Sequence, residues 1–181
     1  MAYTLDVTEE DVFTVLRAFI LNATGTSLSA VVTGPINRAA TPMVLPFVTM
    51  TPVLKEQLEF PHYTVSDPAA QPQVISTTMP TEFRVQLDFY GDSTASDAAQ
   101  TVFSAFQDPA AFDFFSAQTI QGVYPLYVDS LSQAPMVTGE DSYEMRWMMQ
   151  VNLQYNPSLS TTVQTASTLS VAVINVEATY Q

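Results

Sequence analysis

The chain has 181 residues, enough for one domain or for one domain with a long arm, and its hydrophobic fraction of 47% is typical of a folded domain. Eighteen Asp and Glu oppose five Lys and Arg, and this net charge of −13 argues against tight binding to a nucleic-acid phosphate backbone. The absence of cysteine and the single histidine, His62, exclude disulfides, thiolate catalysis and zinc sites built from Cys or several His within one chain.

The N-terminal segment predicts a helix. Thr8 precedes the acidic residues 9–11, which suit the first turn of a helix, and Gly25 lies just past the predicted end. Apolar residues recur at helical spacing on one face: Val12, Val15, Leu16, Phe19 and Ile20. The acidic start differs from a signal peptide, and no apolar run approaches the ~20 residues of a membrane span, so we expect a soluble protein made in a cytoplasm.

The stretch 43–60 is rich in strand-forming residues but contains Pro46 and Pro52. Because proline cannot donate to a central ladder, this pattern predicts a pair of edge or irregular strands that bend at the prolines. Residues 61–73 contain three more prolines and indicate a loop.

Two runs, 74–79 and 82–90, flank Pro80-Thr81 and predict a β-hairpin. The second run alternates cleanly, with Phe83, Val85, Leu87 and Phe89 on one face and Glu82, Arg84, Gln86, Asp88 and Tyr90 on the other. After Gly91, either Ser93 or Ser96 is expected to cap a helix that stops near Asp108-Pro109, and a short helical turn is predicted over 110–117.

The C-terminal third predicts further strands. Residues 120–131 form a predicted strand that Pro125 pushes toward a sheet edge, and 142–155 alternate in period two over the whole run. A Ser/Thr-rich linker is expected over 156–168, followed by a last strand over 169–180.

Together these elements predict an α+β fold, a mostly antiparallel sheet covered by two main helices. We expect one domain over 1–156, with 157–181 as a linker plus a C-terminal strand or arm. Where the two strong strands meet the second helix, five side chains are expected to be buried: Leu87, Phe89, Phe103, Trp147 and Val151.

Residue chemistry gives little support for catalysis. His62 lies in a predicted loop without a nucleophile motif, so a hydrolase built on His62 and a carboxylate is a minor alternative. Neighbouring carboxylates, such as Asp88 with Asp92, or 140–141 with Glu144, fit calcium or acid–base chemistry in principle but are expected by chance in so acidic a chain. We therefore expect no enzyme, no cofactor and no metal site.

Several aromatic residues could in principle stack on a ligand, but we interpret them as core residues: Phe112, Phe114, Phe115, Tyr124, Tyr127 and Trp147. The two arginines on the polar faces of the strong strands, Arg84 and Arg146, are expected to pair with Glu82, Asp88 or Glu144.

Three ordered segments resemble the neck or tail-terminator proteins of tailed bacteriophages. The first is Asn37-Arg38 followed by Pro46 to Pro52, and the second is Phe83 to Gly91. The third joins Pro125-Leu126-Tyr127 to Glu140 to Trp147 and ends in Leu153-Gln154-Tyr155-Asn156.

This resemblance implies a non-enzymatic structural protein of the phage virion neck, assembled in the host cytoplasm. Proteins of this kind cap the finished tail tube as a ring, usually a hexamer, and join it to the head connector, so that DNA passes through the lumen. The implied partners are further copies of the chain, the tail tube protein and a head-completion or connector protein, with the tail sheath as a further candidate. Sequence-specific nucleic-acid binding and membrane binding are not implied.

The interface or structural candidates are Arg84, Asp88, Tyr90, Glu144, Arg146 and Trp147. The loop over 61–73 and the C-terminal strand are the segments expected to reach a neighbouring subunit. Two alternatives remain besides the hydrolase: another head–tail connector or tail-completion adaptor of the virion, and a monomeric binding module.

Overall fold

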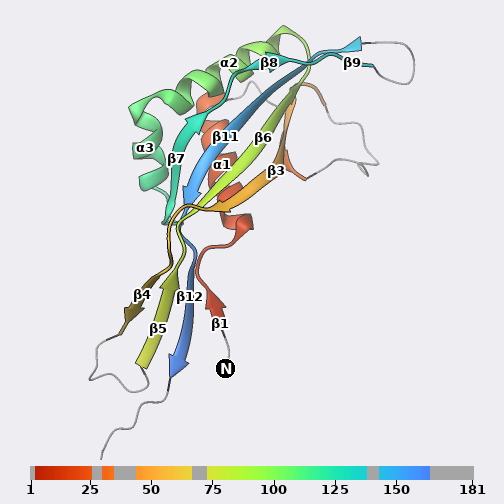
Figure 1. Cartoon of the computed structure of the whole chain (residues 1–181). Helices are drawn as coiled ribbons and strands as arrows, with labels where there is room; N and C mark the ends of the chain where they lie inside the picture. Colours follow the sequence, from red (N-terminus) through yellow and green to blue (C-terminus); the bar gives the residue numbers. More distant parts are fainter. Residues whose placement is uncertain (1–2, 26–29, 35–43, 67–72, 138–142, 164–181) are drawn as a thin grey trace, which may run out of the picture.

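The computed structural model describes residues 3–25, 30–34, 44–66, 73–137 and 143–163 (Figure 1). The helices are α1 (Glu9–Thr24), α2 (Ser93–Gln107) and α3 (Pro109–Ser116). The strands are β1 (Tyr3–Leu5), β2 (Ala30–Thr33), β3 (Phe47–Gln57), β4 (His62–Val65), β5 (Gln73–Thr78), β6 (Thr81–Tyr90), β7 (Val123–Val128), β8 (Ser132–Gln133), β9 (Met136–Val137), β10 (Tyr143–Glu144), β11 (Arg146–Tyr155) and β12 (Ser158–Val163).

The strands form two main sheets that lie in different parts of the molecule. The body sheet has the order β2-β3-β6-β11-β7, with β8 also paired to β11, and the arm sheet has the order β1-β12-β5-β4. Figure 1 shows the arm sheet projecting away from the three helices, which all lie at the body. Among the described strands only β2 and β3 pair in parallel, so the predicted α+β fold with a mostly antiparallel sheet is confirmed, with α3 added to the two main helices.

One long antiparallel ribbon connects the body to the arm. Thr81 pairs with Tyr155 at the end of the body sheet, and Thr78 pairs with Ser158 in the arm sheet, so the pairing register continues unbroken past Pro80 and Pro157. The predicted hairpin between 74–79 and 82–90 is therefore wrong. The two strands follow each other along the ribbon, because Met79 N donates to Pro157 O at 3.0 Å and the ladder continues instead of turning back.

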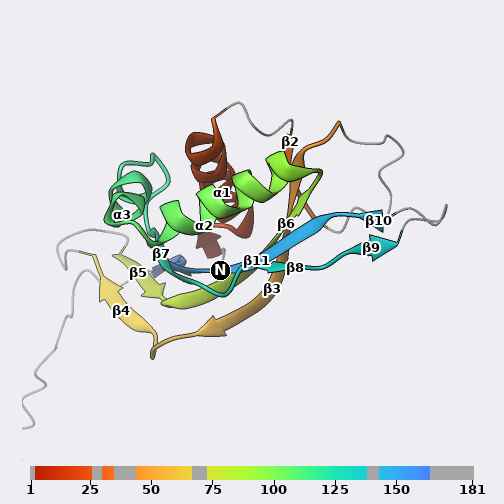
Figure 2. The same ribbon diagram turned by 90° about the horizontal axis from the view of Figure 1, so that it is seen from above.

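The helices cover one face of the body sheet (Figure 2). The apolar face of β6 is buried against them, as the alternation predicts, and so are Met149, Val151 and Leu153 of β11. Leu87, Phe89 and Val151 are buried as expected, but Phe103 and Trp147 are only partly buried. Trp147 lies near the start of β11, where its second neighbour is the two-residue β8 instead of the longer β7.

The helix starts follow local hydrogen-bonding chemistry. Thr8 caps α1 in a capping box with Asp11, since Thr8 Oγ1 accepts from Asp11 N and Asp11 Oδ2 accepts from Thr8 N at 2.8 Å. Asp92, not Ser93 or Ser96, caps α2 by accepting from Thr94 N at 2.9 Å. A carboxylate at this position also interacts favourably with the helix dipole.

Gly91 makes the sharp connection from β6 to α2. Its φ is +140°, a backbone conformation that residues with a Cβ atom rarely adopt. A Cβ at this position would also lie only 3.1 Å from Pro46 Cβ. The glycine that ends the predicted strand is therefore required by both backbone conformation and close packing.

The prolines mark sheet edges, although not always as predicted. The stretch 43–60 contains one strand, β3, instead of a pair of edge strands, and its register against β6 shifts at Pro52. Since β2 pairs only with Phe47 to Met50, β3 itself becomes the edge from Thr51 onward, which is where Pro52 is tolerated. Pro125 lies in the edge strand β7, as predicted.

Two segments predicted as irregular contain strands. His62–Val65 form β4 within the expected loop 61–73, and Ser158–Val163 form β12 within the expected linker 156–168. Each finds a partner strand only in the folded arm, which short-range patterning does not reveal. The predicted strand over 169–180 lies outside the described residues.

Candidate functional site

The face of the body sheet that points away from the helices is polar. We call it the open face, because α1, α2 and α3 all lie on the other side of the sheet (Figure 2). It is formed by alternate residues of the two central strands: Glu82, Arg84, Gln86, Asp88 and Tyr90 of β6, and Arg146, Met148, Gln150, Asn152 and Gln154 of β11. Four of the six predicted interface residues lie here.

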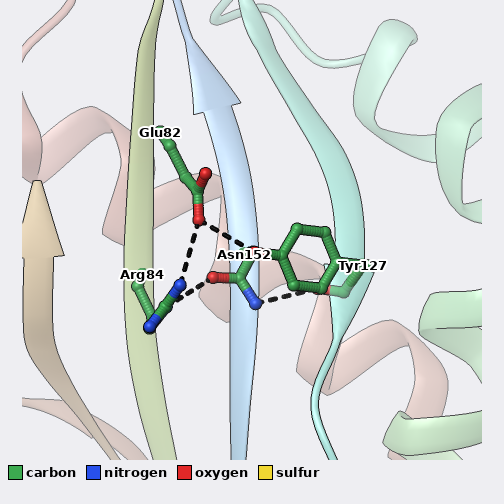
Figure 3. Close-up of polar contacts among 4 residues, drawn as sticks. All are labelled: Glu82, Arg84, Tyr127 and Asn152. Atoms are coloured by element: carbon green, nitrogen blue, oxygen red, sulfur yellow. Dashed lines mark hydrogen bonds and ion pairs between the residues drawn. The ribbon is translucent and has the colours of Figure 1, made fainter. Parts of the chain in front are cut away.

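One hydrogen-bonded cluster on the open face centres on Arg84 (Figure 3). Its Nε donates to Asn152 Oδ1 at 2.7 Å, and its Nη2 lies 3.3 Å from Glu82 Oε1. The same Glu82 oxygen accepts from the Tyr127 hydroxyl at 3.1 Å, and Asn152 Nδ2 donates to the Tyr127 backbone oxygen at 3.5 Å. The cluster thus joins β6, β11 and β7.

The electrostatics of this cluster favour a permanently charged arginine. The Tyr127 hydroxyl, and after it the Glu82 carboxylate, raise the pKa of Arg84 above its ordinary value and outweigh the opposing effect of desolvation. Asn152 is fully buried, so its two side-chain hydrogen bonds satisfy an amide that would otherwise be costly to bury.

A second cluster lies nearer the other end of the open face. Arg146 Nε donates to Asp88 Oδ1 at 3.0 Å, and Gln86 Nε2 donates to both carboxylate oxygens of Asp88 at 3.0 Å. The Asp88 side chain is only 7% exposed. The predicted pairing of the two arginines with acids on the polar face of the sheet is therefore confirmed, Arg84 with Glu82 of its own strand and Arg146 with Asp88 of the neighbouring strand.

The remaining predicted residues are divided among different places. Tyr90 is on the open face and stacks on Phe47 of β3, with ring centroids 4.8 Å apart. Trp147 points to the helix side, where its Nε1 is buried without a hydrogen-bond partner among the described residues. The Glu144 side chain lies outside the described part of the structure. A single six-residue cluster is thus not formed.

Within the described ranges, each cation has a partner inside the same chain. Besides Arg84 and Arg146, Lys55 lies 3.1 Å from Glu9 and above the Phe83 ring, and Arg17 donates to the Val31 backbone oxygen at 3.1 Å. Partial burial lowers the pKa of Lys55, but the Tyr155 hydroxyl and the Glu9 carboxylate raise it by more. The Asp and Glu residues that outnumber these cations therefore make the surface negatively charged.

The groups considered for catalysis or metal binding are not arranged for it. His62 Nε2 lies 3.4 Å from Glu59 Oε2, but both side chains are about two-thirds exposed, at 63% and 67%. Asp88 pairs with Arg146 while Asp92 caps α2, so these two carboxylates have separate structural roles. The described segments contain no cluster of three or more candidate metal ligands, and none of their helices is long and apolar enough to cross a membrane.

The aromatic residues predicted to belong to the core do so only in part. Phe115 is buried and Phe114 is partly buried against the core, where both lie beside Phe19 of α1. Phe112 is more exposed and stacks on Tyr124 at 5.7 Å. Tyr127 instead belongs to the polar cluster on the open face, where its hydroxyl donates to Glu82.

The arm sheet is the part of the site that sequence reasoning missed. None of the residues in β1, β4, β5 and β12 is Asp, Glu, Lys or Arg, although the chain as a whole has a net charge of −13. Its side chains separate into two faces. Hydroxyl pairs occupy one face, with Ser76 to Ser160 at 2.8 Å and Thr78 to Ser158 at 2.6 Å.

The other arm face is apolar and exposed. On its outer strands it presents Tyr3, Leu5, Tyr63 and Val65, with 61%, 46%, 72% and 58% of their surface exposed. The short alternating runs Tyr-Thr-Leu and His-Tyr-Thr-Val were the signal that could have revealed these strands. They are too short to stand out beside the prolines that flank them.

The sequence matches the profile of the phage neck terminator protein family over residues 10–179. No curated protein sequence is significantly similar to the chain. A chain in the solved virion of a native gene transfer agent particle is 16% identical, with 79% of this chain and 91% of that chain covered, at a TM-score of 0.29. That structural similarity is too low to establish a shared fold, whereas the family profile spans nearly the whole sequence. The chain therefore belongs to the phage neck terminator family and is a structural protein of the phage virion neck.

Proposed function

We propose that the chain is a tail terminator, a non-enzymatic subunit of a ring that caps the phage tail tube. In this proposal six copies close the ring, the tail tube protein binds one side and the head-completion or connector protein binds the other. DNA passes through the lumen. Membership of the neck terminator family over residues 10–179 supports this assignment.

The observation that carries the proposal is the arm sheet. A single-layer sheet with an apolar face, including Tyr63 at 72% exposure, buries too little surface to be stable by itself in water. A ring subunit needs two different contact surfaces, one for each neighbour. We assign residues 1–156 to one terminator-like domain, which contributes β1, β4 and β5 to the arm sheet, and residues 157–181 to a C-terminal segment that begins with β12 of the same sheet.

The charge distribution agrees with a DNA channel. With the described cations paired inside the chain, a net charge of −13 per subunit leaves an acidic surface. An acidic wall repels phosphate and lets DNA slide without being held. The tail sheath remains a further candidate partner on the outside of the ring.

Light scattering after size exclusion, together with negative-stain images of the purified chain, tests the ring. We expect a mass close to six subunits and rings with a central opening, either alone or on addition of tail tube protein. A monomer under both conditions would contradict the proposal.

Immunogold labelling of particles tests the position in the virion. We expect label at the junction of head and tail. Label at the distal end of the tail would instead support the alternative function, a tail-completion adaptor.

A further inference from the structure

Among the described residues, no strand or loop pairs with the two outer edges of the arm sheet. β1 lies at one edge and β4 at the other, and neither contains Asp, Glu, Lys, Arg, a proline or a bulge, the devices that usually keep edge strands from pairing. The edges of the body sheet differ. Pro125 lies within β7 and has no backbone N–H to donate, and the Arg17 side chain donates a hydrogen bond to the Val31 oxygen of β2.

The pairing pattern shows which backbone groups face outward. Ser66 N donates to Val74 O at 2.9 Å, so residues 66 and 74 form a hydrogen-bonded pair. Because such pairs alternate along an antiparallel ladder, the N–H and C=O groups of Tyr63 and Val65 point away from β5. The bond from Asp6 N to Ser158 O places the outward groups of β1 at Tyr3 and Leu5 by the same reasoning.

We propose that β4 of each subunit pairs with β1 of the next subunit, so that the arm sheets form one continuous antiparallel sheet around the ring. This inference rests on the proposed ring and names the contact that closes it. The register that uses every outward group sets Tyr3 of one copy opposite Val65 of the next, and Leu5 opposite Tyr63. Thr4 then lies opposite Thr64, as the non-hydrogen-bonded pair between them.

Strand direction and side-chain pattern both fit this contact. Each neighbouring pair within the arm sheet is antiparallel, so β1 and β4 run in opposite directions and the alternation continues across the junction. The four side chains that meet, Tyr3, Leu5, Tyr63 and Val65, all belong to the apolar face of the arm. Aromatic and β-branched pairs of this kind stabilise neighbouring strands.

A second copy fits these edges better than another occupant. One additional strand, from this chain or from another protein, would cover one edge and leave the other open, whereas a closed ring satisfies both edges in every subunit. β1 and β4 contain no Asp, Glu, Lys or Arg in a subunit with a net charge of −13, so these strands of two copies can approach each other with little repulsion.

Disulfide cross-linking tests the contact, because the natural chain contains no cysteine. In the proposed register the Cα atoms of Thr4 and Thr64 lie about 4.5 Å apart, within the range that a disulfide bridges. Within one arm, β1 and β4 are three strand spacings apart, roughly 14 Å, so the two cysteines cannot bridge inside one chain. Oxidised rings of the double variant Thr4→Cys/Thr64→Cys should give a ladder of covalent oligomers that ends at the ring size.

Matched controls separate the outcomes. Thr4→Cys alone, and Thr4→Cys with Thr101→Cys on the exposed side of α2, should give no ladder. Intact rings without a ladder in the Thr4→Cys/Thr64→Cys variant, or with dimers only, would overturn the strand pairing and leave the ring proposal standing. A ladder that appears only after removal of residues 164–181 would show that the chain's own C-terminal segment covers an edge. That result would also overturn the pairing of β1 with β4 between subunits. A chain that forms no ring at all would overturn both proposals.

Proline substitution gives a second measurement. Val65→Pro removes an outward N–H but no bond to β5, so it should abolish the ring while the fluorescence of the single tryptophan in the body is unchanged. Val65→Ala keeps the N–H and should still assemble. Rings that persist in Val65→Pro would contradict pairing through this strand.

Discussion

The two halves of the central ribbon share one register but differ in what covers them. In the body, β6 and β11 alternate between residues buried under the helices and polar residues on the open face. In the arm, β5 and β12 continue the same ladder, yet nearly all their residues are only partly buried. A β ladder by itself therefore does not decide whether a strand belongs to a stable core, and the covering layer does.

The difference also concerns charge. The body half contains two arginine–carboxylate pairs on its open face, whereas hydroxyl pairs link the arm half. Ion pairs with little exposure fix geometry inside one subunit, while an uncharged ladder can accept a neighbour of the same net charge. We interpret the body as the self-sufficient half and the arm as the half that is completed by assembly.

The largest expected effect separates core from arm. Phe89→Ala in β6 should reduce the free energy of unfolding by about 3–5 kcal/mol, because the side chain is fully buried. Phe60→Ala, at 90% exposure beside the arm, should change it by less than about 0.5 kcal/mol in the monomer. Denaturant unfolding measures both. A similar cost at the two positions would contradict the division into a self-sufficient body and a dependent arm.

A smaller effect is expected on the open face. Asp88→Asn removes the charge that Arg146 and Gln86 contact and should cost about 1.5–3 kcal/mol, the range for hydrogen bonds to charged groups. Asp97→Asn, at an exposed position of α2, serves as the matched control and should be nearly neutral. If the two variants unfold alike, the Asp88 cluster does not stabilise the body.

Removal of the N-terminal cap of α1 should have a still smaller effect on the free energy of unfolding, and this effect should depend on pH. Thr8→Ala should cost about 1 kcal/mol near pH 7. Hydrogen bonds from the Thr8 side chain and backbone lower the pKa of Asp11 below its ordinary value of 3.8. The contribution of the ionised Asp11 carboxylate to the free energy of unfolding is therefore complete at a pH above its ordinary pKa. It is lost as the pH falls through the lower pKa of Asp11 in the folded state. Unfolding curves at pH 7 and below pH 4 should thus show the difference between wild type and Thr8→Ala shrinking in acid.

The smallest expected effect is a change in assembly with salt. Each subunit carries a net charge of −13 and the arm strands carry none, so screening should ease the approach of subunits without weakening the contact. Sedimentation across a salt series should show assembly becoming stronger as salt rises. Rings that dissociate in salt would instead indicate a contact held by ion pairs between subunits.

Much of the body could be predicted from the sequence because its signals are local and strong. The period-two runs in β6 and β11, the helical stripe of α1 and the proline in β7 each reflect the immediate surroundings of those residues. The pairing of Arg84 and Arg146 followed from strand geometry and from the scarcity of cations. Asn152 and Tyr127 were not expected in that site, since a buried amide on a polar face becomes visible only when three strands meet.

The sequence by itself determined the apolar stripes, the helix starts, the acidic charge and the family. Only the tertiary structure decided that 74–79 and 82–90 continue one ribbon instead of folding back, and that β1 and β4 become the edges of a separate sheet. The physical reason is that alternation specifies which face of a strand is buried, while strand order depends on partners far away in the chain. β1 pairs with β12 across almost the whole length of the chain, and no short segment carries that information.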